Sequence, residues 1–578
     1  MHPSSGETEE IKANALSAGR MRLWPAVAIC VGHLALLWVA LASPTIIMNA
    51  VGIVGAPVLA TLLLIIWWMT ASRSPWRIRL AGLMLYLAII AWIVLSQPHD
   101  GIRMLIVALP ALNFGLVAAL VATYRVPRIQ MAMAIVVLLV GAVAFPLFRI
   151  TDVNSNLSPV LGWRWTPTSE ELLASTTTAH KPGARAEVPA QAAPEDWPGF
   201  RGANRDGVAK GVEFALNWQE NPPKELWRRR VGLGFSSFAA VGDYLFTQEQ
   251  RFDDEAVVCY GAATGDEIWL TAVKARFEDS TGSGPRATPT FEGGKIYAQG
   301  ATGILHCLDA ATGAPLWQKD IGEDTGAGLP TWGFASSPLV TDKHVIIFSG
   351  GPEGKSVAAY DKLTGNRAWH AGGGTHGYAS AQQFSIDGAA QILMASSLGI
   401  QSFAPETGSL MWEHRWPVST NPRVVQPLLF DSNGVLLGTA EGKGTRLLEV
   451  SKTNDTWAVQ EKWTTKSFRP YFNDFVFHNG YCYGFDGNML ACMDARTGDR
   501  KWKGDRYGGQ LLLVEDLEVL VVLTEKGKIA LVKATPESFE EIAVVDALAG
   551  KTWNHPIVAH GRLIVRNAEE AVCFELPK

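Results

Sequence analysis

Long apolar segments dominate the first quarter of the chain, at residues 23–43, 47–69, 79–96, 104–123 and 131–149. Each is close to the roughly 20 residues that an α-helix needs to cross the hydrocarbon core of a membrane. A single apolar run could be a signal peptide, but five in succession cannot be. The pattern therefore predicts a membrane domain of about five transmembrane helices over residues 23–150.

The basic residues around these segments predict how the helices cross the membrane. They gather before the first segment and in every second connection, at Lys12, Arg20, Arg22, Arg73, Arg77, Arg79, Arg125 and Arg128. The other connections have no basic residue or only Arg103. Because cytoplasmic loops carry the excess of Lys and Arg, we expect residues 1–22 to be cytoplasmic. An odd number of crossings then places the remaining chain in the periplasm, outside a bacterial inner membrane.

The pattern changes twice after the last apolar segment. Residues 151–196 are polar and rich in Thr, Ala, Pro and Glu, a composition that cannot bury a core and predicts a flexible linker. From residue 197 to residue 578, short apolar stretches alternate with turn residues, as in an all-β domain.

One phrase recurs through the all-β region: an apolar pair, Thr-Gly, three residues and then Trp. Clear copies end at Trp269, Trp317, Trp369, Trp412 and Trp502, and a degenerate copy, LEVSKTNDTW, ends at Trp457. The spacings of 48, 52 and 43 residues between the first four tryptophans are those of four-stranded propeller blades. Thr-Gly supplies the positive-φ turn between the third and fourth strands. The Trp then lies on the outer strand, where it can pack against the neighbouring blade.

A second register precedes these phrases and predicts the number of blades. Eight segments align as the opening strands of blades: GFSSFAAV, GPRATPTF, FASSPLV, YASAQQF, RVVQPLLF, FNDFVF, GGQLLLV and WNHPIV. The last blade has only three strands before the chain stops, whereas the segment around Trp227 has no blade of its own. We therefore expect this early strand to complete the last blade and close the ring.

Charge and cysteine content exclude two further interpretations. The formal net charge is −5 and the chain has no block of Lys and Arg, so we expect no nucleic-acid partner. Cys259, Cys307 and Cys492 occupy one repeat position, and equivalent positions of different blades lie too far apart for a disulfide. Cys482 and Cys492 belong to one predicted hairpin, but strand alternation puts them on opposite faces.

The repeated phrase resembles the repeat of pyrroloquinoline-quinone (PQQ) dehydrogenases and of the related BamB-like propellers. This resemblance covers residues 197–578 and implies an all-β, eight-bladed β-propeller preceded by an α-helical transmembrane bundle. The order of five spans followed by a propeller also resembles the layout of membrane-bound quinoprotein glucose dehydrogenase.

The opening strands of a propeller line its central channel, so their polar residues should converge on one mouth. We expect a planar anionic ligand such as PQQ to contact Arg251, Arg286, Trp332, Gln426, Arg469, Asn473, Trp553 and Asn554. Ser336, Ser337, Tyr378, Gln510 and His555 belong to the same set, and Gln248-Glu249-Gln250-Arg251 is expected to form a loop that leans over the ring. Asp474 and Glu249 are the candidate catalytic bases, and Asp474, Asn473 and Glu249 are the candidate calcium ligands. Any one of these residues could equally cap a loop or contact channel water.

Two functions remain open from the sequence. The first is a binding or scaffolding propeller, anchored in membrane lipid, whose mouth holds a periplasmic protein or a small molecule. The second is a PQQ- and calcium-dependent dehydrogenase that oxidises a sugar or an alcohol and passes electrons to ubiquinone. Against the second, the blades lack long insertions, and the chain has neither an adjacent Cys pair nor a Cys-x-x-Cys-His haem motif.

Overall fold

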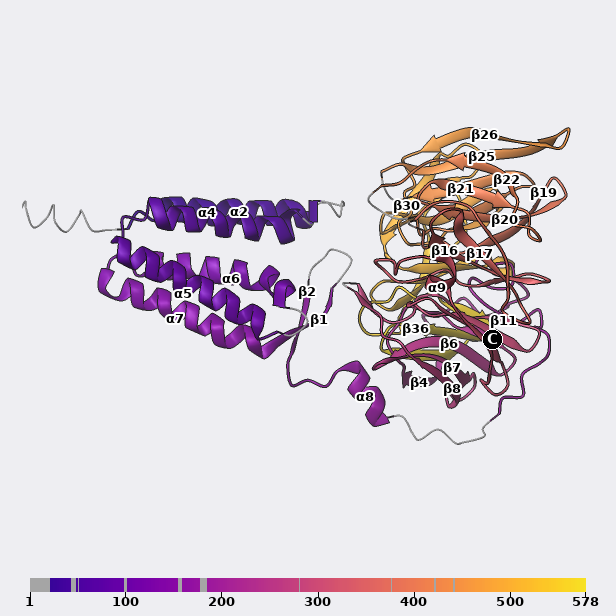
Figure 1. Cartoon of the computed structure of the whole chain (residues 1–578), viewed down its shortest axis with the longest axis horizontal. Coiled ribbons are helices and arrows are strands. Elements are labelled where there is room, and N and C mark those ends of the chain that lie inside the picture. The colour runs from indigo at the N-terminus through magenta and orange to yellow at the C-terminus, as the bar shows by residue number, and fades with distance from the viewer. Residues whose placement is uncertain are drawn as a thin grey trace, which may run out of the picture. The chain divides into compact units, whose positions relative to one another are not determined.

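The computed structural model describes residues 21–42, 48–49, 51–97, 101–153, 159–176, 185–279, 281–375, 377–419, 423–439 and 442–578. It divides into two compact units, Met1–Pro167 and Thr168–Lys578, one helical and one made of strands (Figure 1). Lys12 and Arg20, on which the predicted orientation partly rests, lie outside the described residues.

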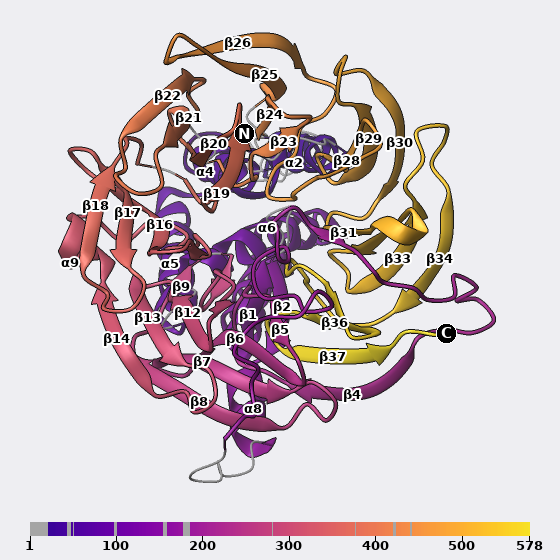
Figure 2. The ribbon, with the colours of Figure 1, turned by 90° about the vertical axis from the view of Figure 1, so that its right-hand side faces the viewer.

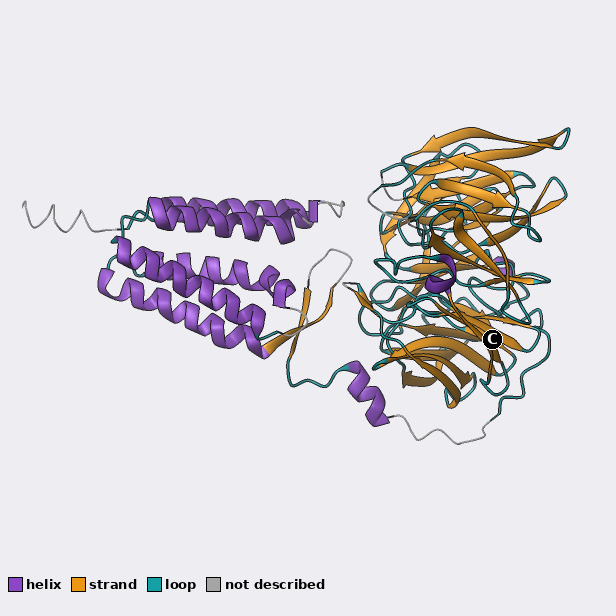
Figure 3. Cartoon of the chain, in the orientation of Figure 1, coloured by secondary structure: helices purple, strands orange, loops and turns teal. Residues whose placement is uncertain are grey.

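The first unit is a bundle of apolar helices, drawn in purple in Figure 3. These are α2 (Trp24–Ala42), α4 (Ala56–Thr70), α5 (Trp76–Leu95), α6 (Gly101–Ala122) and α7 (Pro127–Ala144), with a π-helical turn (Val51–Gly55) before α4. Five helical segments in the described residues are long and apolar enough to cross a membrane, which confirms the predicted bundle. Apolar side chains lie all round each helix, as expected where the surrounding solvent is lipid.

The region expected to be a flexible linker contains regular structure. A 3-10 turn (Phe145–Leu147) leads into a hairpin of β1 (Phe148–Val153) and β2 (Pro159–Trp163), and α8 (Ser169–Thr176) follows. Thr168 and Glu171 cap α8 reciprocally, since each side chain accepts a hydrogen bond from the backbone N–H of the other, at 2.7 and 3.1 Å. Glu170 attaches the helix to the propeller through the Phe252 N–H (2.7 Å) and Arg276 (3.1 Å).

The second unit is a ring of antiparallel blades of four strands each, one of them extended by a short parallel strand, seen along its axis in Figure 2. The first four blades are β5–β8 (Ala239–Val241, Tyr244–Arg251, Asp254–Gly261, Glu267–Lys274), β11–β14 (Thr290–Glu292, Lys295–Gln299, Ile304–Asp309, Pro315–Asp320), β15–β18 (Leu339–Val340, His344–Gly351, Lys355–Asp361, Arg367–Ala371) and β19–β22 (Gln382–Ile386, Ala389–Ser396, Gly399–Phe403, Leu410–Arg415). The next three are β23–β26 (Leu428–Phe430, Gly434–Thr439, Gly444–Thr453, Thr456–Thr465), β27–β30 (Val476–His478, Tyr481–Asp486, Met489–Asp494, Arg500–Arg506) and β31–β34 (Gln510–Val514, Val519–Leu523, Lys528–Lys533, Glu541–Asp546).

The last blade joins both ends of the propeller sequence. It consists of β35 (Ile557–Ala559), β36 (Arg562–Arg566), β37 (Glu570–Glu575) and the early strand β4 (Lys224–Arg230). Trp227 pairs with Cys573 across the β4–β37 ladder. The described residues therefore form the predicted eight blades, and the ring closes through the strand around Trp227 as expected.

The Thr-Gly and Trp positions of the phrase join neighbouring blades. The indole N–H of Trp269 donates to the Ala310 carbonyl of the next blade at 3.0 Å, and that of Trp369 donates to the Pro405 carbonyl at 3.2 Å. The ring of Trp369 lies against Gly408, whose φ is +69°. Glycine is required at position 408 for two reasons. The turn has a left-handed backbone, and a Cβ there would lie 2.5 Å from the indole.

The degenerate phrase of the fifth blade differs from the prediction. The position expected for Trp457 is held by Trp463, whose indole N–H donates to the Arg496 carbonyl at 2.9 Å. Strands β25 and β26 are longer here and turn tightly at Asn454 and Asp455, with φ of +48° and +62°. The longer hairpin moves the interblade tryptophan six positions further along the outer strand.

The cysteines are free and buried wherever the structure describes them. Each of four faces the outer-strand tryptophan of its own blade, in the pairs Cys259–Trp269, Cys307–Trp317, Cys492–Trp502 and Cys573–Trp227. The sequence pattern missed Cys573, because its tryptophan is at the other end of the propeller sequence. Cys482 faces Met493 while Cys492 faces Tyr483, so the two thiols lie on opposite faces as predicted.

The Gly408 contact can be tested by comparing two glycine substitutions. Gly408→Ala introduces both a left-handed alanine and an overlap with Trp369, and we expect it to destabilise the propeller by about 2–4 kcal/mol. Gly388 has φ +72° but open space around its Cβ position. Gly388→Ala should therefore cost about 1 kcal/mol, for the backbone alone. Equal shifts in the unfolding midpoint of the two variants would contradict the packing role of Trp369.

Candidate functional site

Polar residues at the start of each blade hold the next blade by hydrogen bonds. The backbone N–H of Ser237 donates to Thr288 Oγ1 (3.1 Å), and that of Thr288 donates to Ser337 Oγ (2.9 Å). The same relation continues from Ser337 to Ser380, Gln426, Asp474 and Gln510. Ser237 Oγ in turn donates to the carbonyl oxygen of the last blade's His555 at 2.6 Å. These eight residues, one in each aligned opening segment, are called the girdle below.

The girdle changes the interpretation of the predicted channel residues. The eight openings do converge on the axis, as their alignment indicates, but these side chains are directed along the ring to the neighbouring blade. Their oxygen atoms satisfy backbone N–H groups that burial would otherwise leave unpaired. Ser337, Gln426, Asp474 and Gln510 thus have a structural role that any ligand would have to share.

Residues 197–209, here called the crossing segment, run across the ring from blade to blade. Trp197 exchanges backbone hydrogen bonds with Ala240 (2.8 and 2.9 Å). The guanidinium of Arg205 donates to the carbonyls of Ser337 and Pro338 (2.9 and 3.0 Å). The segment ends as β3 (Val208–Ala209), a strand parallel to β31 in the seventh blade. In each blade these contacts are to a girdle residue or to residues that follow it.

The crossing segment brings a buried charge to Asp474. Arg201 Nη1 lies 3.0 Å from Asp474 Oδ2, and the two side chains are only 2% and 5% exposed. His555 Nε2 lies 3.3 Å from the same oxygen. Burial raises the pKa of Asp474, but Arg201 and His555 outweigh it and hold that pKa below its usual range. Burial lowers the pKa of His555, so the cluster is an ionised carboxylate paired with one arginine.

Sequence analysis did not single out Arg201. Arg201 lies ahead of the first repeat, in WPGFRGANRDG. There two arginines stand among glycines, without the alternation of apolar and polar residues that marks a strand. Arg201, Gly202, Arg205 and Gly207 all have positive φ, so the segment is a series of tight turns. Neither this shape nor its place inside the ring follows from strand periodicity.

Glu249 belongs to a separate buried network. Its carboxylate accepts hydrogen bonds from Tyr260 Oη (2.6 Å), the Gly232 N–H (2.8 Å) and Arg251 Nε (2.9 Å). Burial favours the neutral acid, but Arg251 and Arg566 hold the pKa of Glu249 below its usual range. The prediction of a loop at residues 248–251 is wrong, because these residues form the end of β6. Polar residues in a strand fully enclosed by neighbours mimic the composition of a loop.

The opposite end of the channel carries aromatic rings, which stand two positions before girdle residues. Trp553 stacks on Phe235 with centroids 5.3 Å apart and contacts Phe472 at 5.1 Å. Lys551 Nζ lies 4.6 Å from the Trp553 ring, and Arg286 lies 5.5 Å from the Phe235 ring. These five residues are called the aromatic mouth. The Phe235, Phe472, Trp553 and Lys551 side chains are half-buried and present partly exposed surface, whereas the Arg286 side chain is only 10% exposed.

Other predicted ligand residues occupy different places. Trp332 lies beside Tyr378 on the same side of the ring, with centroids 5.2 Å apart. Asn473 Nδ2 donates to the Gly509 carbonyl (2.5 Å) and Asn554 Nδ2 to the Ser236 carbonyl (2.8 Å). Arg469 turns away from the girdle and binds Asp486 at 2.8 Å.

Comparison with known proteins agrees with this architecture. A family model described as outer membrane protein assembly factor BamB matches residues 218–303 and 253–503. BamB of Shewanella oneidensis is 25% identical over 233 residues, which cover 38% of this chain and 56% of that protein. Quinohemoprotein alcohol dehydrogenase ADH IIB of Pseudomonas putida is 33% identical over 123 residues, 20% of this chain and 17% of that protein. The second unit is a PQQ-like, BamB-like β-propeller.

Solved structures of both kinds also align with this chain, with TM-scores below 0.5. BamB from Moraxella catarrhalis has a TM-score of 0.44 at 14% identity, covering 61% of this chain and 97% of its own. A europium-containing methanol dehydrogenase has a TM-score of 0.49 at 14% identity, covering 66% of this chain and 98% of its own. The chain spans about half the length of the Shewanella relative, so the relatives' whole activities do not transfer to it.

The donor set of this PQQ-like propeller does not fit a calcium-bound quinone at the predicted residues. Calcium takes six to eight oxygen ligands, usually with several carboxylates. Asp474 and Glu249 instead each bind a buried arginine, and the Asn473 amide nitrogen donates to a carbonyl. Among the described residues, no group of three or more His, Cys, Asp or Glu side chains could hold a metal.

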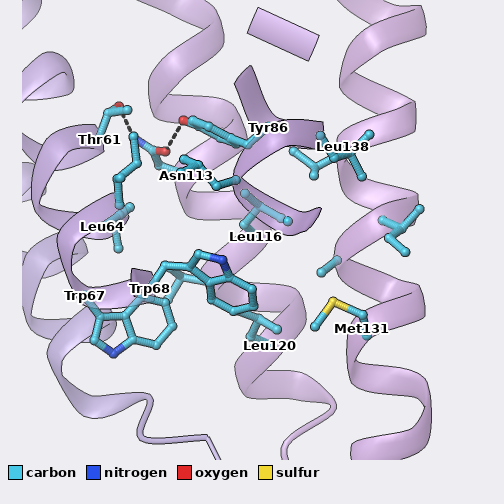
Figure 4. A pocket seen from close by; sticks show the side chains of 17 residues that line it. Thr61, Leu64, Trp67, Trp68, Tyr86, Asn113, Leu116, Leu120, Met131 and Leu138 are labelled. Carbon is cyan, nitrogen blue, oxygen red and sulfur yellow. Dashed lines mark hydrogen bonds between the residues drawn. The ribbon is translucent and has the colours of Figure 1, made fainter. Parts of the chain in front are cut away.

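The helical unit contains a cavity of about 110 Å³ between α4, α5, α6 and α7 (Figure 4). Its walls are apolar except for a hydrogen-bonded chain across three helices. Tyr86 Oη donates to Asn113 Oδ1 (2.7 Å), and Asn113 Nδ2 donates to Thr61 Oγ1 (2.8 Å). The polar groups are satisfied by one another, as the interior of a membrane requires.

Replacing Asp474 should show how much the girdle depends on its buried charge. In Asp474→Asn, Arg201 stays buried without a carboxylate, so we expect a loss of about 3–5 kcal/mol from the stability of the propeller. Asp546, whose side chain is 87% exposed, provides the control. Asp546→Asn should leave the unfolding midpoint within about 1 °C of the parent, since a surface ion pair contributes little. A wild-type midpoint for Asp474→Asn would show that the ion pair is not structural.

Proposed function

We propose that this protein is a membrane-anchored binding module whose PQQ-like propeller holds a periplasmic protein at its aromatic mouth. The observation that carries the proposal is the difference between the two ends of the channel. The crossing segment occupies one end with buried contacts, whereas Phe235, Phe472 and Trp553 remain half-exposed at the other. Aromatic residues and arginine are the groups that dominate protein interfaces.

The relatives support a protein as the partner. Those from Shewanella oneidensis and Yersinia pestis are both named outer membrane protein assembly factor BamB. Lys551 and Arg286 lie beside the rings, Asp279 pairs with Arg286 at 2.7 Å, and the Trp553 indole N–H donates to Glu525 at 2.9 Å. An extended segment with aromatic side chains would match the exposed rings by stacking.

A quinoprotein dehydrogenase is supported less well. The Pseudomonas putida relative aligns with 20% of this chain, and the predicted carboxylates are bound to arginines. A general base needs a free carboxylate next to its substrate. No observation supports ubiquinone as a partner.

We further propose that the helices cross a bacterial inner membrane with the N-terminus in the cytoplasm. Five long apolar helices support insertion. Arg73 between α4 and α5 with Arg77 and Arg79 in the first turn of α5, and Arg125 before α7 with Arg128 at its start, support the orientation.

This orientation can be checked with reporter fusions to the full membrane unit. Alkaline phosphatase joined after residue 167 should be active, because that enzyme folds only outside the cytoplasm, and a fluorescent protein joined there should be dark. The same reporters joined after Ser74, in the connection between α4 and α5, should give the opposite result. A fluorescent fusion after residue 167 would contradict the proposed topology.

The mouth can be tested in cells by site-specific photocrosslinking of the full chain. A photoreactive amino acid at Phe472 should give a discrete crosslinked protein that disappears when Trp553→Ala is added. The same probe at Val544, 40% exposed on the outer strand β34, is the control and should give none. Because Trp553→Ala removes only a half-buried ring, the unfolding midpoint should fall by a few degrees at most.

Two outcomes would overturn the proposal. Equal crosslinking at Phe472 and Val544 would show that the mouth has no preferred partner. Stoichiometric binding of PQQ by purified protein in the presence of Ca²⁺, with dye-linked oxidation of glucose or a simple alcohol, would instead establish the dehydrogenase.

A further inference from the structure

Three basic side chains surround one buried carboxylate on the sixth blade. Asp486 ends β28 and its side chain is only 1% exposed. Its oxygens lie 2.8 Å from Arg469 Nε, 2.6 Å from Lys503 Nζ and 3.3 Å from Arg500 Nη1. Arg469 comes from the connection between the fifth and sixth blades, whereas Arg500 and Lys503 come from the outer strand β30. Four groups from three segments therefore meet at one point.

The charges at this point do not balance. Burial raises the pKa of Asp486, but Arg469 and Lys503 hold that pKa below its usual range, so the carboxylate is ionised at neutral pH. Three cations and one anion leave a net charge of about +2. In the described part of the chain, Arg469, Arg500 and Lys503 form salt bridges with no acidic residue other than Asp486.

Two other arginines of the propeller, Arg251 and Arg286, each have at least one carboxylate partner. Arg251 contacts two carboxylates, Glu249 and Glu267, both at about 3 Å, and Arg286 has Asp279 to itself. The ratio of three cations to one carboxylate at Asp486 therefore differs from that at Arg251 and Arg286. Holding three like charges together costs free energy that a single carboxylate only partly offsets.

The cations are accessible although the carboxylate is not. Their side chains are 42% exposed for Arg469, 38% for Arg500 and 27% for Lys503. Asp486 holds the charged ends of all three side chains in place. Arg500 also donates a 3.3 Å hydrogen bond to the Ser467 carbonyl. A preorganised set of charged donors facing solvent is the arrangement that binds an oxyanion.

We infer that Arg469, Arg500 and Lys503 form an oxyanion site on the sixth blade and that its ligand carries a phosphate group. The net charge selects the ligand. A phosphate monoester carries nearly two negative charges at neutral pH and would neutralise the site, whereas a carboxylate would neutralise half of it. Its terminal oxygens can accept from two guanidinium groups and one ammonium group together. The inference is independent of the partner proposed at the aromatic mouth.

The first experiment measures binding of inorganic phosphate to the full-length protein in nanodiscs of phosphatidylcholine. Equilibrium dialysis with labelled phosphate should give saturable binding of one phosphate per chain. Lys503→Gln and Arg500→Gln should each weaken it tenfold or more. Lys501, an exposed neighbour on β30, is the matched control, and Lys501→Gln should change the affinity less than twofold.

A second arm identifies the source of the phosphate. If the ligand is a lipid headgroup, replacing part of the phosphatidylcholine by phosphatidic acid, whose headgroup is a phosphate monoester, should raise the unfolding midpoint of the wild type but not of Lys503→Gln. If it is a soluble phosphate, added phosphate should raise that midpoint in phosphatidylcholine nanodiscs. The inference is overturned if neither ligand binds the wild type, or if Lys501→Gln lowers binding as much as Lys503→Gln.

Discussion

Hydrogen bonds connect neighbouring blades of this propeller both near its axis and at its outer edge, and the rest of the structure depends on these connections. Near the axis, the backbone N–H of one girdle residue donates to the side chain of the next. At the outer edge, a tryptophan such as Trp369 lies over the Thr-Gly turn of the following blade and donates to one of its carbonyls. A blade alone would expose both sets of groups to solvent, so the ring is stable only when closed.

The crossing segment leaves one end of the channel open for the recognition that we propose. Arg201 neutralises Asp474 inside the girdle, and Arg205 binds the carbonyls that open the third blade. These contacts use the polar groups that the opening strands direct toward the axis. What remains partly exposed is the ring of aromatic side chains two positions earlier in the same strands. The geometry therefore favours recognition by stacking and shape over coordination of a metal.

Charge balance separates the structural ion pairs from the candidate binding site. Asp474 and Glu249 are almost wholly buried, and arginine partners balance their negative charges. Replacing either carboxylate should therefore lower the stability of the propeller. Asp486 is also buried, but its three basic partners exceed it and reach solvent. The same residue types at similar distances thus predict different roles, because the local sum of charges differs.

The sequence by itself determined the two units, the apolar spans, the eight blades and the closure of the ring through Trp227. These follow from hydrophobic length and from the spacing of Thr-Gly and Trp, which reflect contacts within a blade or between successive blades. It did not determine the partners of Asp474 and Glu249 or the tryptophan of the fifth blade. Arg201 reaches Asp474 across 273 residues of sequence, and Asp486 takes its cations from the connection before the sixth blade and from β30. The Arg201–Asp474 pair forms only when the ring closes and the Asp486 cluster only when the sixth blade folds, because no local periodicity relates their residues.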